Sequence, residues 1–254
     1  MSPPGQELGS LPEVGAPVRD GSDGVAQRRD EAKAKASLAL SWSGGKDSAL
    51  TLLELRRELG CDPCALITTV TETYNRISMH GVRRELLALQ AQALGLPLAE
   101  VLIPASCSNE LYETRMREAL ASEQLRSVAS VAFGDLFLED VRAYREERLA
   151  AAGRRGLFPL WGRDTTELAQ RFISLGFEAI IVCVDPRTLD AAFAGRRYDE
   201  RLLAELPPDV DPCGENGEFH TFVHGGPIFR RPIAWTPGEV IARDGFVFAD
   251  LAPA

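Results

Sequence analysis

The stretch from Leu38 to Gly60 reads LALSWSGGKDSALTLLELRRELG, and it restricts the possible folds more than any other feature of the chain. A short apolar run enters the turn Ser43–Ser48, here called the SGGKDS turn, and then becomes a helical pattern. Such a turn collects backbone N–H groups at the positive end of a helix dipole, which suits a phosphate. Its two glycines permit positive φ and close approach to a ligand. The sequence therefore predicts a strand, an anion-binding turn and a helix.

Lysine usage singles out one residue of this turn. The chain has 28 basic residues, of which only Lys33, Lys35 and Lys46 are lysines. Lys46 would add a cationic contact to a bound phosphate, and Ser48 a hydroxyl hydrogen bond. The spacing of the glycines and Lys46 does not fit the Walker A motif, GxxxxGK[ST], and the dinucleotide-binding motif GxGxxG is absent. A turn without a ligand remains the alternative, since Gly-Gly also opens helices.

Beyond this turn, short apolar runs alternate with longer amphipathic segments, which is typical of βαβ units with a buried parallel sheet. The predicted strands are 38–42, 64–70, 98–103, 127–133 and 178–184. We expect an α/β fold with an open doubly wound parallel sheet and a small C-terminal α+β appendix. The predicted boundaries are 1–36 for a disordered leader, 37–190 for the main domain and 191–254 for the C-terminal region.

Composition favours a cytoplasmic protein that does not bind nucleic acid. Hydrophobic residues make up 45% of the chain, and no apolar run reaches the 18 residues of a membrane span. The net charge of −9 opposes nonspecific binding to phosphate backbones. Five cysteines without a secretory signal indicate reduced thiols. Cys61 and Cys64 form a lone CxxC, either a metal or redox pair or a plain helix-to-strand connection.

Four segments carry a family resemblance: SGGKDS at 43–48, FGDL at 133–136, PLWGRD at 159–164 and PCGENGEFHTF at 212–222. Together they resemble the PP-loop ATP pyrophosphatases, the adenine nucleotide alpha hydrolases of the HUP superfamily. The nearest subfamily is the one that contains diphthine ammonia ligase. Where the ligase pattern has Gly-Glu-Gly-Gly-Glu-Tyr-Glu-Thr, this chain has GENGEFHT at 214–221, which looks like the bacterial branch.

The resemblance implies an ATP-binding domain at 37–190 and a substrate-binding region at 191–254. The implied nucleotide-binding residues are Ser43, Gly44, Gly45, Lys46, Asp47, Ser48, His80 and Gly134. The implied catalytic residues are Lys46, Asp135, Glu215, Glu218 and His220. Magnesium would bind Asp47 and Asp135. Other interpretations stay open: a helix cap for Asp135, solvated turn acids for Glu215 and Glu218, and a capping or core histidine for His80.

The implied reaction splits ATP into AMP and pyrophosphate, adenylating an acceptor carboxylate that ammonia then amidates. The acceptor would be a small molecule or carried on a protein, and the oligomeric state stays open, a homodimer included. Two alternatives remain: a tRNA-modifying PP-loop enzyme, which the acidic body disfavours, and a non-catalytic adenine-nucleotide sensor.

Overall fold

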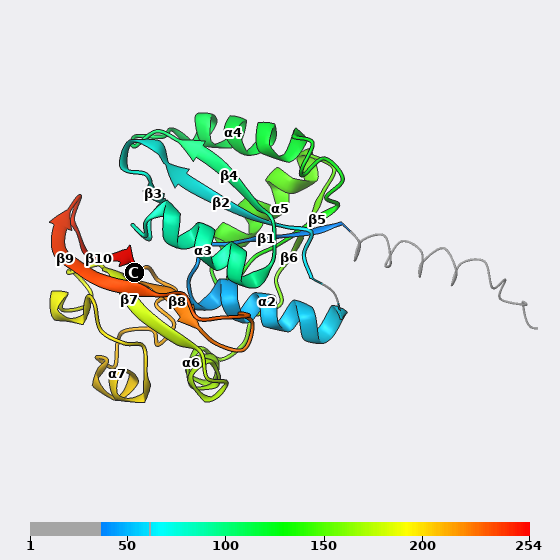
Figure 1. Ribbon diagram of the computed structural model, residues 1–254. Helices are drawn as coiled ribbons and strands as arrows, with labels where there is room; N and C mark the ends of the chain where they lie inside the picture. Colours follow the sequence, from blue (N-terminus) through cyan, green and yellow to red (C-terminus); the bar gives the residue numbers. More distant parts are fainter. Residues whose placement is uncertain (1–36, 61) are drawn as a thin grey trace, which may run out of the picture.

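A parallel sheet, sheet A, forms the first half of the molecule (Figure 1). The computed structural model describes residues 37–60 and 62–254, so the predicted leader and Cys61 lie outside the described residues. The parallel strands run in the order β4-β2-β1-β5-β6. Their bounds are β1 Leu38–Ser41, β2 Ala65–Thr71, β4 Leu98–Ile103, β5 Ser130–Ala132 and β6 Arg155–Leu157. Short β3, Arg76–Ile77, pairs antiparallel with the end of β2.

Helices cover both faces of sheet A, as the doubly wound prediction requires (Figure 1). On one face lie α2, Lys46–Leu59, and α3, Arg84–Leu94; on the other lie α4, Asn109–Ala121, and α5, Glu139–Ala151. Side chains of β1 alternate between two apolar cores, Leu38 and Leu40 in one and Ala39 in the other. The predicted α/β class and doubly wound sheet are therefore confirmed.

A second, antiparallel sheet, sheet B, has the strand order β8-β7-β10-β9. Its strands are β7 Glu178–Val184, β8 Phe219–Gly225, β9 Trp235–Arg243 and β10 Phe246–Pro253. The remaining elements are α6 Thr165–Ser174, α7 Glu200–Glu205 and the 3-10 turns η1 Glu72–Tyr74 and η2 Ala191–Phe193. No helix of the described ranges has the length and apolarity to cross a bilayer.

The prediction that 178–184 is the fifth parallel strand was wrong. This segment is β7, which pairs antiparallel with β8 and β10, whereas the fifth parallel strand is the short β6. Six of the seven residues of β7 are buried. A continuous apolar run of this kind fits a strand covered on both faces in either type of sheet, so the pattern does not tell the two apart.

Candidate functional site

The SGGKDS turn joins β1 to α2, as predicted. Gly44 has φ +79°, and a Cβ there would lie 2.7 Å from Gln90 Oε1, so both backbone conformation and space require glycine. Gly45 occupies the N-cap position of α2 without a side-chain cap. The Ser48 hydroxyl donates to the Gly45 carbonyl at 2.8 Å. The turn thus brings the positive end of the α2 dipole to the end of β1.

Strand β8 of sheet B binds directly to this turn. The Lys46 backbone N–H donates to Thr221 Oγ1 at 3.0 Å, and the Val223 N–H donates to the Gly44 carbonyl at 2.9 Å. Gln90 Nε2, from α3, donates to the carbonyls of Gly44 and Val223 at 3.0 and 2.6 Å. The GENGEFHT segment, Gly214–Thr221, therefore ends against the first turn of α2.

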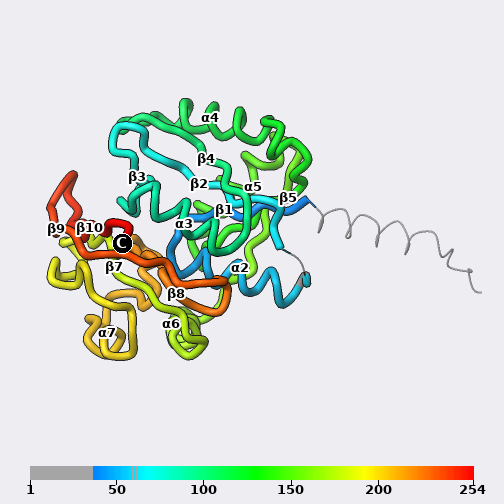
Figure 2. The backbone as a smooth tube through the Cα atoms, in the orientation of Figure 1, coloured from blue at the N-terminus to red at the C-terminus, as the bar shows by residue number. Residues whose placement is uncertain are grey.

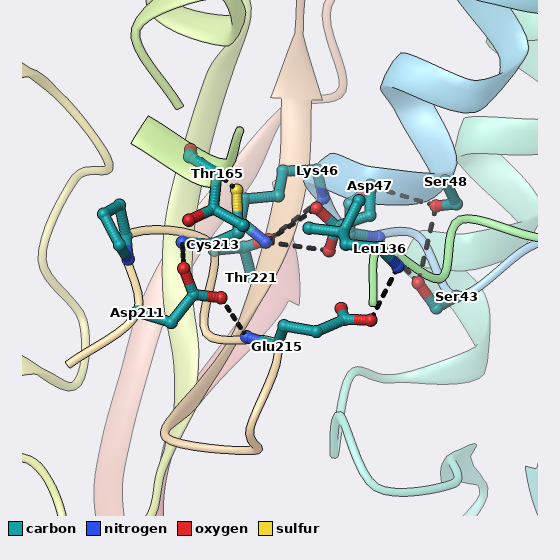
Figure 3. Close-up of polar contacts among 12 residues, drawn as sticks. Ser43, Lys46, Asp47, Ser48, Leu136, Thr165, Asp211, Cys213, Glu215 and Thr221 are labelled. Atoms are coloured by element: carbon teal, nitrogen blue, oxygen red, sulfur yellow. Dashed lines mark hydrogen bonds and ion pairs between the residues drawn. The ribbon is translucent and has the colours of Figure 1, made fainter. Parts of the chain in front are cut away.

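Lys46 and Asp47 form a close ion pair inside the site (Figure 3). Lys46 Nζ lies 2.7 Å from Asp47 Oδ2, and the lysine side chain is only 3% exposed. Burial alone would lower the pKa of Lys46, but the Asp47 carboxylate raises it, with a smaller contribution from Glu215, so the ammonium stays charged. Burial raises the pKa of the neighbouring Cys213 to about 12, which keeps that thiol protonated.

Gly134 and Asp135, just after β5, lie beside this ion pair. A Cβ on Gly134 would come within 2.9 Å of the Asp47 carbonyl carbon, so only glycine allows this approach. Asp135 Oδ2 lies 2.8 Å from Arg145 Nε, and burial raises the pKa of Asp135. Asp135 does not cap α5, whose N-cap position is Leu138. The two predicted magnesium ligands, Asp47 and Asp135, thus occupy adjoining positions.

Glu215 and Glu218 differ in their surroundings. Glu215 Oε1 accepts from the Leu136 N–H at 2.7 Å, next to the SGGKDS turn (Figure 3). Burial raises the pKa of Glu215 to about 7, and Asp47 adds to the rise. Glu218 is 3% exposed; its Oε1 accepts from the Asp211 N–H at 3.1 Å, and Oε2 has no hydrogen-bond partner within the described residues. Glu215 therefore faces the turn, while Glu218 ties its own segment together.

His80 and His220 form a stacked pair between the two sheets. Their ring centroids lie 4.4 Å apart at an interplanar angle of 28°. A Cβ on Gly45 would lie 3.3 Å from His80 Cε1, so the pair adjoins the SGGKDS turn. Burial lowers the pKa of His220 to about 4 and, together with His220, lowers that of His80 well below its ordinary range. Both imidazoles are neutral at pH 7.

A cavity of about 640 Å³ lies between α4 and α5, over the strands of sheet A. It is lined by Ser41, the last residue of β1, and by Phe133, which follows β5. Tyr112 of α4 and Tyr144 of α5 line it as well. Arg145 also lines it and connects it to Asp135 through the ion pair. The cavity combines aromatic walls with a charged end, which suits a nucleoside-sized ligand.

Some residues of this site were not predicted from the sequence. Gln90 and Arg145 were missed, although Gln90 is a polar residue in an otherwise apolar stripe of α3. Such a residue signals a buried hydrogen-bonded group. Asp211 was missed as well; its carboxylate accepts from the Glu215 N–H at 2.9 Å and holds the turn that carries Glu215.

A glycine turn after the first strand of a parallel sheet, hydrogen-bonded to a second, antiparallel sheet, defines a class of two-part α/β proteins. Matches to models of known protein families identify the family within this class. Residues 36–154 match the diphthamide synthase N-terminal domain, and residues 164–243 match the diphthamide synthase C-terminal domain. The chain belongs to the diphthine ammonia ligase-like PP-loop family.

Curated relatives carry the name diphthine–ammonia ligase. The human protein is 24% identical over 83% of this chain and 86% of its own length. The Bos taurus protein is 27% identical over 70% of this chain and 71% of its own. The Schizosaccharomyces pombe protein is 25% identical over 78% of this chain, which spans only 36% of that longer relative.

Proposed function

We propose that this protein is an ATP-dependent ligase that adenylates an acceptor carboxylate, releases pyrophosphate and then forms an amide with ammonia, releasing AMP. One observation carries the proposal: the GENGEFHT segment is hydrogen-bonded to the phosphate-binding turn through Lys46 N–H and Thr221 Oγ1, at 3.0 Å. This contact brings Glu215 and His220 beside the place where phosphates would bind. Membership of the ligase-like family supports the same reaction.

In the first half-reaction, an oxygen of the acceptor carboxylate attacks the α-phosphorus of ATP. The new bond joins that oxygen to the α-phosphorus, and the bond from the α-phosphorus to the bridging oxygen breaks, so pyrophosphate leaves. The first-turn N–H groups of α2 other than that of Lys46, which donates to Thr221, would hold the phosphates. Lys46 stays a cation because neighbouring acids raise its pKa, so it would stabilise the negative charge that develops at the α-phosphate.

In the second half-reaction, ammonia attacks the acyl carbon and AMP leaves. Ammonium must first lose a proton, and Glu215, with a pKa of about 7, suits a proton acceptor at neutral pH. His80 and His220 are neutral, so they would offer hydrogen bonds without repelling ammonium. Glu218 would hold the GENGEFHT segment in shape through its bond to Asp211.

The cavity between α4 and α5 is the proposed place of the adenosine part of ATP, since its aromatic walls suit a base. Among the described residues, no group of three or more His, Cys, Asp or Glu side chains is arranged to hold a metal ion. Mg²⁺ usually takes one or two carboxylates together with phosphates and water, which Asp47 and Asp135 fit. Bound there, it would neutralise phosphate charge.

The test uses ATP labelled at the α-phosphate, ¹⁵N-ammonium and a panel of small and protein-borne carboxylates. We expect AMP and pyrophosphate in equal amounts and ¹⁵N in the product; ADP and phosphate instead would refute the proposal. Lys46→Ala should abolish turnover, whereas Arg57→Ala, an exposed cation on the same helix, should not. The bacterial branch, the cytoplasmic location and a small-molecule or protein-borne carboxylate as acceptor stay predictions.

A further inference from the structure

Strand β9 is the free edge of sheet B. Among the described residues only β10 pairs with it, and seven consecutive residues, Thr236 to Ala242, are exposed. Val240 and Ile241 are 58% and 38% exposed. The β9–β10 hairpin projects from the side of the molecule (Figure 2). An edge of this kind presents unpaired backbone N–H and C=O groups to another strand.

The hairpin turn fixes which backbone groups of β9 point outward. Asp244 and Gly245 have φ of 52° and 84°, as in a two-residue hairpin turn, and Arg243 stands opposite Phe246. Residues that flank such a turn exchange hydrogen bonds, so the polar backbone groups of Arg243 face β10. Because these backbone groups alternate in direction along a strand, the N–H and C=O groups of Ala242 and Val240 point away from β10, toward the open edge. An incoming strand would therefore bond to Ala242 and Val240.

We propose that the partner at this edge is a second copy of the chain, with the two β9 strands paired antiparallel about a twofold axis at Ile241. This register places Val240 opposite Ala242 of the second copy, so that the outward backbone groups of the two strands meet. It also places Glu239, which lies at the register shift of the β9–β10 ladder, opposite Arg243 of the second copy, twice by symmetry. Opposite charges facing each other across strands stabilise the pairing.

The Arg243 guanidinium is held in place by two aromatic rings of its own chain. It lies 4.3 Å from the ring centroid of Tyr74 and 5.0 Å from that of Phe248. Arg243 Nε lies 3.7 Å from Asp244 Oδ2 and has no hydrogen-bond partner within the described residues. Glu239 of a second copy would add a second carboxylate to this guanidinium. The opposite edge strand of sheet B, β8, already binds the SGGKDS turn, so β9 is the edge that is open to a partner.

A disulfide experiment tests the register directly. In the proposed dimer, Ile241 faces Ile241 of the second copy at a non-hydrogen-bonded position. The Cα atoms of such a pair lie about 4.5 Å apart, within reach of a disulfide. Full-length Ile241→Cys should cross-link into a dimer on mild oxidation, with the bond mapped by mass spectrometry. Val240→Cys is the matched control, because residue 240 faces residue 242 rather than itself. Equal cross-linking of both variants, or of neither, would overturn the register.

Light scattering tests the charge pairing. The wild-type protein should be a dimer at micromolar concentration, and Glu239→Arg or Arg243→Glu should weaken the dimer about tenfold or more. The double exchange E239R/R243E should restore it, whereas Glu123→Arg, at a distant side chain 92% exposed, should change nothing. Circular dichroism checks that each variant folds.

A monomeric wild type, including one that binds a different protein at β9, would overturn the proposal, as would failure of the double exchange. Neither experiment depends on ATP turnover.

Discussion

Gln90 offers the sharpest test of how the two sheets are held together. It is completely buried and makes three hydrogen bonds: Oε1 accepts from Trp42 Nε1 at 2.9 Å, and Nε2 donates to the carbonyls of Gly44 and Val223. Gln90→Leu keeps a similar volume but removes the donor and the acceptor. The Gly44 carbonyl retains the Val223 N–H, while Trp42 Nε1 and the Val223 carbonyl lose this partner.

A buried polar group without a partner costs about 1–3 kcal/mol, so two such groups cost about 2–6 kcal/mol. Burial of the added apolar surface offsets part of this, and we expect a loss of about 3 kcal/mol. For a chain of this size that corresponds to a melting temperature about 6–12 °C lower. Urea unfolding at pH 7 measures it. Gln92→Leu, at an exposed position of the same helix, should stay within about 0.5 kcal/mol of wild type. If Gln90→Leu and Gln92→Leu are equally stable, the reasoning fails.

Three further predictions concern the walls of the site. Gly134→Ala should cost about 1–3 kcal/mol in urea unfolding and weaken ATP binding, because the added methyl group meets the Asp47 backbone; unchanged values would contradict this contact. Thr221→Val should cost about 1 kcal/mol, since it removes the acceptor of the Lys46 N–H; a variant as stable as wild type would show that the bond contributes nothing. Because the pKa of Glu215 is raised to about 7, the folded state keeps a proton that the unfolded chain has released, so stability falls as pH rises from about 4.5 to about 7. Glu215→Gln should remove roughly 1–2 kcal/mol of that fall, and parallel stability curves for the two proteins would refute it.

The SGGKDS turn was predictable because everything that forms it is local. An apolar strand, two glycines and a helix follow one another within a few residues, and the structure places them as the pattern indicates. The covering of both faces of sheet A followed in the same way from alternating strands and helices. These parts depend on the periodicity of apolar residues and on the residue types of a turn, both of which can be read from a single sequence.

The rest of the site depends on contacts between distant parts of the chain. Lys46 and Thr221 are separated by 175 positions, and no local pattern predicts that they form a hydrogen bond. The sheet to which β7 belongs depends on its partners β8 and β10, which the residues of β7 do not specify. Gln90 could have been found, because it is a polar residue among buried apolar ones. Its partners, Trp42 just after β1 and Val223 of β8, could not be predicted from the local sequence.

The apolar core that contains Leu38 and Leu40 of β1 also contains Leu86 of α3 and Phe222 of β8, so it extends from sheet A through the helices into sheet B. The segments that match the N-terminal and C-terminal domain families thus share one interior. Each segment expressed alone would expose apolar surface that the other normally covers, and would aggregate or need the other half for solubility. For this protein, the two family models therefore mark two segments of the sequence, and we expect the folding unit to contain both segments.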